Sequence, residues 1–175
     1  FGYKLICAGD LLRSEKSSGS ELGIKISELI DKGNLVPDNM ITDIMFNEIK
    51  KPIALGRSFL IDGYPRTIRQ AIDLDRMLNI SVVVWVNVSE ETTIKRNLNR
   101  GLTSGRPDDS NVDIIKQRIK NYNDISYPIK DYYQKLNKVV EIDGEGTPES
   151  VYKEVVDTLF QTEIFKEPRE IGDII

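Results

Sequence analysis

The sequence contains no histidine and only one cysteine, Cys7, among its 175 residues. This scarcity excludes a disulfide framework within the chain, zinc sites built from thiolates or imidazoles, and mechanisms that use a histidine base. No apolar run approaches the roughly 20 residues that a membrane-spanning helix needs. The first ten residues, FGYKLICAGD, also lack the basic and then apolar layout of a signal peptide. We therefore expect a cytoplasmic protein without a membrane partner.

An excess of basic residues is also lacking. The chain has 24 Lys and Arg against 28 Asp and Glu, which gives a formal net charge of −4. An acidic chain repels polyanions, so we expect no nucleic-acid partner, and any bound phosphate must be held by local basic groups. With 39% apolar residues, the chain is long enough for one domain with a sizeable core.

Four apolar runs of strand length are present, rich in β-branched residues and nearly continuous rather than alternating. They occupy residues 3–8, 58–62, 81–88 and 138–143. Such runs are typical of parallel strands that are covered on both faces. Amphipathic segments of helical spacing, such as residues 20–32 and 90–99, lie between them. The alternation predicts an α/β doubly wound parallel sheet, in which ligands bind at the carboxyl ends of the strands.

Several arginines follow or lie near turns at that predicted edge. They are Arg13, Arg66, Arg100, Arg106 and Arg118. A guanidinium binds phosphate oxygens in a bidentate manner and keeps its charge at neutral pH. Any single arginine is more often a solvated surface residue. Arg66 is the exception, because it follows a glycine and a proline directly after a predicted buried strand.

Two polar residues of the segment GRSFLIDGYPRTIRQA have more than one interpretation. Asp62 ends the strand and either holds Mg²⁺ through water or caps the following turn. Gln70 lies four residues after Arg66 on the same face of a predicted helix. Its amide can read the edge of an adenine, although a helical glutamine is usually a surface residue.

The segments AGDLLRSE, KGNLVP, FLIDGYPRTIRQA, RGLTSGRPDDS and IIKQRIKNYN follow one another in this order. Together they resemble the adenylate kinases, within the nucleoside monophosphate kinases, from residue 1 to about residue 159. The resemblance implies a three-layer P-loop kinase-like fold over residues 1–160. It also implies a monophosphate-binding region at about 8–36, a short lid at 100–110 without an inserted zinc-bearing domain, and a tail or linker at 161–175.

The resemblance assigns roles to residues by position. Arg66, Arg106 and Arg118 would be catalytic, and Arg100 and Gly146 would contact ATP. Asp108 and Asp109 would be lid carboxylates, and Asp62 would orient hydrated Mg²⁺. The residues implied in AMP binding are Ala8, Arg13, Asn34, Leu35, Val36, Gly63, Tyr64, Pro65, Arg66, Gln70, Arg106 and Arg118.

The implied activity is reversible phosphoryl transfer from MgATP to AMP by a monomer, giving two ADP. Such transfer needs positioning and charge neutralisation more than a base. Two departures leave alternatives open. First, no G-x-x-x-x-G-K phosphate loop occurs in the chain. The strand, loop and helix that begin the family pattern are therefore expected to be missing. One alternative is thus an inactive nucleotide-binding module of a larger protein. Ala8, where adenylate kinases usually have threonine, resembles the UMP/CMP kinases, which are the other alternative.

Overall fold

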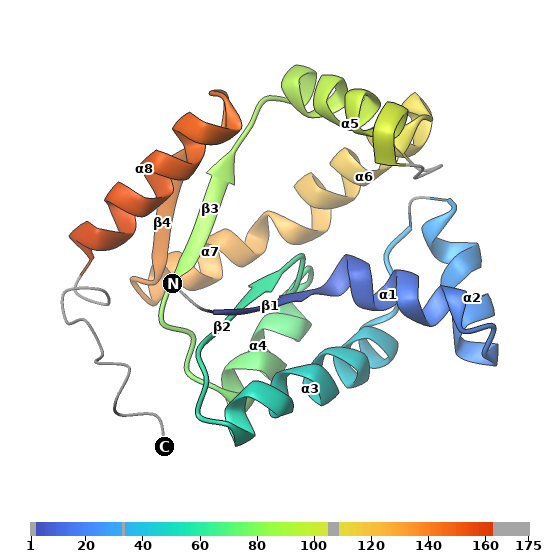
Figure 1. The fold of residues 1–175 in the computed structure, drawn as a ribbon, viewed down its shortest axis with the longest axis horizontal. Helices are drawn as coiled ribbons and strands as arrows, with labels where there is room; N and C mark the ends of the chain where they lie inside the picture. The colour runs from blue at the N-terminus through green and yellow to red at the C-terminus, as the bar shows by residue number, and fades with distance from the viewer. Residues whose placement is uncertain (1–2, 33, 105–108, 163–175) are drawn as a thin grey trace.

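The computed structural model describes residues 3–32, 34–104 and 109–162. Strands and helices alternate along this part of the chain (Figure 1). The elements are β1 (Lys4–Cys7), α1 (Ala8–Ser17), α2 (Glu21–Ile30), α3 (Asp38–Ala54), β2 (Phe59–Asp62), α4 (Ile68–Met77), β3 (Val83–Asn87), α5 (Glu90–Ser104), α6 (Val112–Asn121), η2 (Tyr122–Ser126), α7 (Pro128–Lys135), β4 (Val139–Asp143) and α8 (Pro148–Gln161). The predicted α/β class with parallel strands is confirmed.

The four strands form two parallel pairs in the described part of the chain. β1 pairs with β2, so that Cys7 lies opposite Asp62, and β3 pairs with β4. Residues from both β2 and β3 line a cavity of about 2650 Å³. Leu60 of β2 is 52% exposed and Val86 of β3 is 42% exposed, because both residues line this cavity. The carboxyl end of β2 therefore borders an open space.

Helices pack against one face of the β1–β2 pair and bury the main core there (Figure 1). Helix α3 contributes Ile41, Met45 and Ile49, which repeat every four residues and so lie on one face of the helix. This face packs with Ile6 of β1 in the same cluster. A second, smaller cluster joins α4 to α7 through Ala71, Ile129 and Tyr133.

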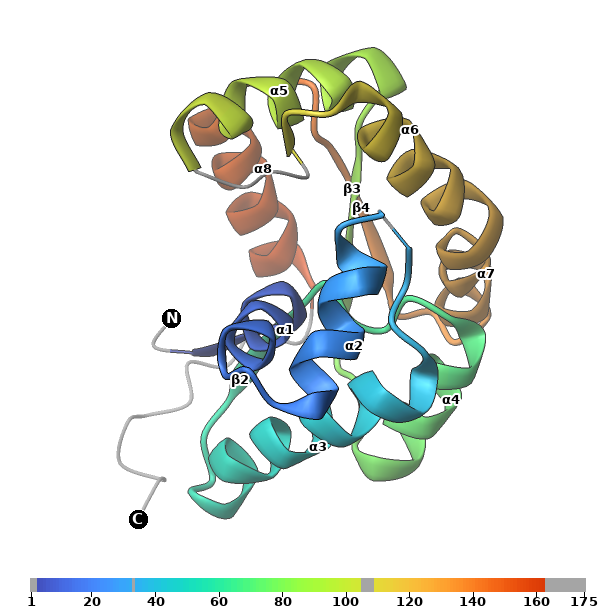
Figure 2. The ribbon, with the colours of Figure 1, turned by 90° about the vertical axis from the view of Figure 1, so that its right-hand side faces the viewer.

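The remaining helices surround the β3–β4 pair. Figure 2 shows α5 crossing one end of this pair, with α8 and the run of α6 and α7 on either side. The π-helical turn η2 joins α6 to α7 without a break in the helical path. Trp85 of β3 packs against Tyr122 and Tyr127 at this turn, with ring centroids 5.7 and 5.9 Å apart. These contacts place η2 beside the cavity.

Side-chain caps fix where several helices begin. Ser20 accepts a hydrogen bond from the backbone N–H of Gly23 at the start of α2, and Thr147 caps α8 in the same way. Thr67 accepts from the N–H of Gln70 and so begins α4 just after the segment that follows β2. None of the helices in the described ranges combines the length and apolar character that a membrane crossing requires.

Candidate functional site

The candidate site lies around the cavity at the carboxyl ends of β1 and β2. Most residues implied in monophosphate binding line it, together with Asp62. They are Ala8, Arg13, Asn34, Leu35, Val36, Gly63, Tyr64, Pro65, Arg66, Gln70 and Arg118. Arg106 and Asp108 lie outside the described residues. Arg100, Asp109 and Gly146 are described, but they are not among the lining residues.

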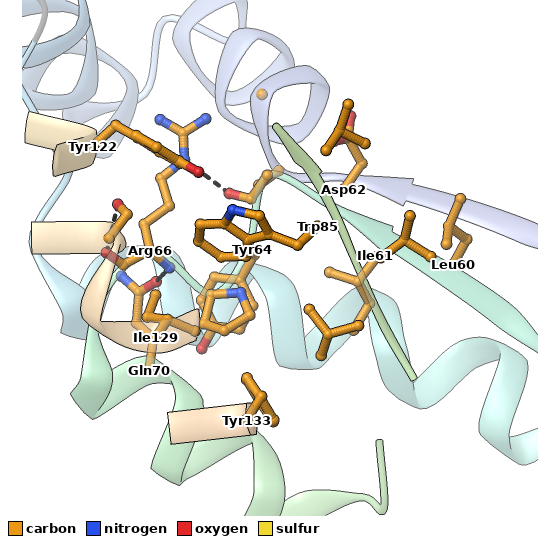
Figure 3. Close-up of a pocket in the computed structure, with 18 of the residues that line it drawn as sticks. Leu60, Ile61, Asp62, Tyr64, Arg66, Gln70, Trp85, Tyr122, Ile129 and Tyr133 are labelled. Atoms are coloured by element: carbon orange, nitrogen blue, oxygen red, sulfur yellow. Dashed lines mark hydrogen bonds between the residues drawn. The ribbon is translucent and has the colours of Figure 1, made fainter. Parts of the chain in front are cut away.

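The turn after β2 directs Arg66 into this cavity (Figure 3). Gly63 has φ of +73°, a left-handed conformation that side chains other than glycine rarely adopt. Its carbonyl oxygen accepts a hydrogen bond from Nε of Arg66 at 2.9 Å. The backbone carbonyl of Arg66 accepts another from Oγ of Ser126, also at 2.9 Å. The start and the direction of the Arg66 side chain are thus fixed by η2 and by the turn.

The electrostatic surroundings of Arg66 suit an anion. Desolvation by the surrounding chain lowers the pKa of the Arg66 guanidinium, although the residue keeps exposed surface, and the positive charge of Arg118 lowers this pKa further, while Asp62 acts in the opposite direction. Arginine stays protonated in proteins despite such shifts. Two positive charges therefore influence each other at the wall of one cavity, where a phosphate group would relieve their repulsion.

Gln70 is 3% exposed, and its amide is held from both sides. Its Oε1 accepts from the backbone N–H of Arg66 at 2.7 Å, a contact that Figure 3 shows. Its Nε2 donates to Oδ1 of Asp38 at 2.7 Å. A surface role for Gln70, one of the two interpretations of the sequence, is therefore wrong.

Asp62 ends β2 beside Cys7. The thiol of Cys7 donates to Oδ2 of Asp62 at 3.3 Å, and burial together with this carboxylate raises the pKa of the thiol. A protonated Cys7 is the expected form, which agrees with a structural rather than nucleophilic role. Asp62 itself keeps exposed surface toward the cavity.

The predicted lid and ATP residues form two other clusters. Asp109 accepts from Nε and Nη2 of Arg100 at 2.6 and 2.7 Å, and from Nη1 of Arg118 at 3.1 Å. The pKa of the Asp109 carboxyl is lowered, mainly by the hydrogen bonds from Arg100 and to a smaller extent by the hydrogen bond from Arg118. Residues 100–104, which the sequence placed in the lid, are the last turn of α5.

The loop at residues 144–146 is held by a residue that the sequence analysis did not single out. Arg96 donates from Nη1 to the carbonyl of Gly144 at 2.6 Å, and from Nη2 to the carbonyls of Glu145 and Gly146 at 3.1 and 2.7 Å. The carboxylate of Glu145 in turn accepts from Oγ1 of Thr92 at 2.6 Å. The backbone near Gly146 is thus tied to the first two turns of α5.

The family model for adenylate kinase matches residues 1–138. The chain belongs to the adenylate kinase family. It is 38% identical over 156 residues to human adenylate kinase isoenzyme 1, a match that covers 89% of this chain and 80% of the human protein. It is 42% identical over 159 residues to the adenylate kinase of Parabacteroides distasonis, covering 87% of this chain and 82% of that protein. Adenylate kinases are nucleoside monophosphate kinases, so the predicted enzyme class and the transferase and ATP-binding assignments are confirmed.

Membership of the adenylate kinase family does not by itself test the individual residue roles, which stay predictions. Two residues that contact the predicted site residues were missed. Asp38 bonds to Gln70 across 32 residues of sequence, and Ser126 bonds to Arg66 across 60. Neither contact has a local sequence signal, because both partners lie on elements that meet only in the folded chain.

Proposed function

We propose that the chain provides the AMP side of an adenylate kinase that transfers the terminal phosphoryl group of MgATP to AMP, giving two ADP. In this reaction the bond from the γ-phosphorus to the ADP oxygen breaks, and a bond to a phosphate oxygen of AMP forms. The observation that carries the proposal is the 2.7 Å bond from the N–H of Arg66 to Gln70. This bond joins the backbone of Arg66, whose guanidinium is suited to phosphate, to the side-chain amide of Gln70, which is suited to a base, so both lie in one fixed segment.

The ATP side is proposed to need a further segment in the cavity. In the described part of the chain, β2 pairs only with β1 and β3 only with β4, while both line the same space of about 2650 Å³. The chain has no G-x-x-x-x-G-K loop whose backbone could bind the ATP phosphates. A parallel strand that enters this space could pair with β2 or β3, each of which has one partner strand in the described ranges. The absence of a G-x-x-x-x-G-K loop also favours the second candidate function, a module that binds AMP without phosphoryl transfer.

Asp62 fits the proposed use of Mg²⁺. Magnesium keeps most of its water and needs only one or two carboxylates, and Asp62 is a carboxylate with exposed surface at the end of β2. No cluster of three or more potential metal ligands occurs in the described ranges, so a cage made entirely of side chains is not part of this proposal. When bound, Mg²⁺ would neutralise negative charge on the ATP phosphates. Asp62 would accept hydrogen bonds from the water around the ion.

The experiment compares the 175-residue chain with the same chain preceded by a designed strand, G-x-x-x-x-G-K loop and helix. ADP formation is measured in a coupled assay with AMP, CMP or UMP as the acceptor. We expect transfer by the extended chain, with AMP preferred. A preference for CMP or UMP would overturn the base assignment in favour of a UMP/CMP kinase. AMP binding by calorimetry without transfer by either version would favour the module.

Arg66→Ala tests the residue that carries the proposal. Losing charge-assisted contacts to the phosphate should cost about 3 kcal/mol in kcat/KM, or roughly 150-fold. The matched control is Arg69→Ala in the first turn of α4, three residues after Arg66, since the Arg69 side chain is exposed and pairs with Asp73. A kcat/KM for Arg66→Ala within about twofold of that of the control would remove Arg66 from the mechanism. The monomeric state and cytoplasmic location expected from the sequence stay predictions.

A further inference from the structure

The Gln70 amide has only one orientation that its neighbours permit. The two ends of a glutamine amide have nearly the same shape, so the orientation follows from the hydrogen-bond partners. The carboxylate of Asp38 can only accept and contacts Nε2, while the backbone N–H of Arg66 can only donate and contacts Oε1. Turning the amide by 180° would oppose oxygen to carboxylate and N–H to N–H. Because Gln70 is buried, water cannot compensate for that mismatch.

Asp38 is itself held in place by α4. Its Oδ2 accepts from Oγ1 of Thr67 at 2.9 Å, and the same hydroxyl oxygen accepts from the backbone N–H of Gln70 at 3.1 Å. Asp38 is also the first residue of α3, where a negative charge is favoured by the helix dipole. The carboxylate thus joins the N-termini of α3 and α4 and cannot follow a rotating amide.

The fixed amide offers a defined pattern to a base. After these two bonds, Nε2 has one N–H left and Oε1 has one lone pair left, so a base that approaches the amide would meet a donor beside an acceptor. This pattern matches adenine or cytosine, which place an amino donor beside a ring-nitrogen acceptor. Guanine and uracil place a carbonyl oxygen where the amino group would be, and this oxygen would meet Oε1. A freely turning amide would accept both classes.

We propose that Asp38 is a positioning residue that fixes the Gln70 amide and thereby makes the site select amino bases over oxo bases. This inference rests on the proposed function, in that Gln70 must face the base of the bound monophosphate. It assigns the choice between AMP and GMP to a carboxylate on α3 acting through Gln70, without a contact of its own to the base.

Asp38→Asn tests the proposal with little change of shape. An asparagine amide can turn to donate to Oε1 or accept from Nε2, so the constraint on Gln70 is weakened. Binding of AMP, GMP, CMP and UMP is measured by calorimetry on the 175-residue chain. We expect the ratio of GMP to AMP dissociation constants to fall about tenfold, within the range for one bidentate base contact. A ratio measured within one variant does not depend on how much of that variant is folded.

Two further variants calibrate the result. Asp43→Asn makes the same charge change at an exposed position of α3 and should leave the ratio unchanged. Gln70→Leu removes the amide and gives the ratio expected without base reading. The role of Asp38 would be overturned if the ratio of GMP to AMP dissociation constants is unchanged in Asp38→Asn but falls in Gln70→Leu. The proposed function would then stay intact. An equal fall in Asp43→Asn would overturn the role of Asp38 as well.

A measurement on the unsubstituted chain keeps the proposal falsifiable if Asp38→Asn does not fold. The Nε2 protons of Gln70 are observable by NMR, and the one donated to Asp38 should exchange with solvent at least tenfold more slowly than in a free glutamine amide. Exchange of both protons at the free rate would overturn the proposal. If the unsubstituted chain binds none of the four monophosphates, the proposed function fails at that first step, and the role of Asp38 in selectivity falls with it.

Discussion

Asp109 is the buried charge whose removal has the most predictable effect. It is 0% exposed and accepts two hydrogen bonds from Arg100 and one from Arg118. These bonds connect the C-terminal turns of α5 to α6. The substitution Asp109→Asn keeps the size of the side chain, removes its charge and places an N–H donor against the donors of a guanidinium.

The expected loss of stability lies below that for a fully buried ion pair. Removing one partner of a fully buried pair typically costs about 3–5 kcal/mol, because an uncompensated charge stays inside. Here the side chains of Arg100 and Arg118 are 43% and 34% exposed, so water can solvate them once Asp109 is neutral. We therefore expect a loss of about 2 kcal/mol in the free energy of unfolding, or about 4–8 °C in Tm for a chain of this length.

The pH dependence gives this prediction a second, independent test. The pKa of Asp109 is lowered in the folded state, so its contribution is fully present above the ordinary carboxyl pKa of 3.8. It is lost as the pH falls through the lower folded value, because protonation then neutralises the carboxylate. The stability difference between the unsubstituted chain and Asp109→Asn should stay constant from about pH 7 to 5, and should shrink below about pH 4.

Urea unfolding followed by circular dichroism over this pH range measures both quantities. Asp113→Asn, an exposed residue in the first turn of α6, is the matched control for loss of one negative charge. The reasoning is refuted if Asp109→Asn unfolds within about 0.5 kcal/mol of this control, the usual range for surface substitutions. It is also refuted if the pH profiles of Asp109→Asn and the unsubstituted chain run parallel down to about pH 3.

The other two predictions concern close packing and the ATP side. Gly23→Ala would place a Cβ 2.3 Å from the carbonyl oxygen of Glu15. We therefore expect the free energy of unfolding, measured in urea, to fall by about 2 kcal/mol. The control Lys25→Ala, at an exposed neighbouring position, should change this free energy little. Arg96→Ala removes the three bonds to the carbonyls of residues 144–146. In the extended chain it should raise KM for ATP several-fold and leave KM for AMP unchanged, and an equal rise in both would contradict the assigned position of this loop.

The strands were predicted closely because β-branched runs are bounded by polar or turn-forming residues. The runs at 3–8 and 58–62 became β1 (Lys4–Cys7) and β2 (Phe59–Asp62). Helix ends were harder to predict. The helix predicted at 90–99 continues to Ser104, because Gly101 does not end it. A Cβ on Gly101 would lie 3.0 Å from the backbone of Asp109, so this glycine permits a close approach within the helix.

The site could be predicted only where its residues lie close together in sequence. Residues 62–70 contain the end of a strand, a turn and the first turn of a helix, and local rules predict each of these. The partners of this segment come from elsewhere in the chain. Asp38 is placed opposite Gln70 by the packing of α3 beside α4, and Ser126 is placed opposite Arg66 by the π-helical turn. A single sequence contains no local signal for contacts at such separations.

The arrangement around Arg66 is better explained by binding than by stability. Its N–H, Nε and carbonyl groups are all engaged by Gln70, Gly63 and Ser126, so the residue is held in place before any ligand arrives. The cost is visible in its lowered pKa, which reflects burial and the like charge of Arg118, only partly offset by Asp62. Repulsion between two guanidinium groups at one cavity wall does not stabilise the fold, so their placement is better explained by a ligand. A dianionic phosphate bound by both groups would offset their mutual repulsion, and the fixed geometry would reduce the ordering entropy lost on binding.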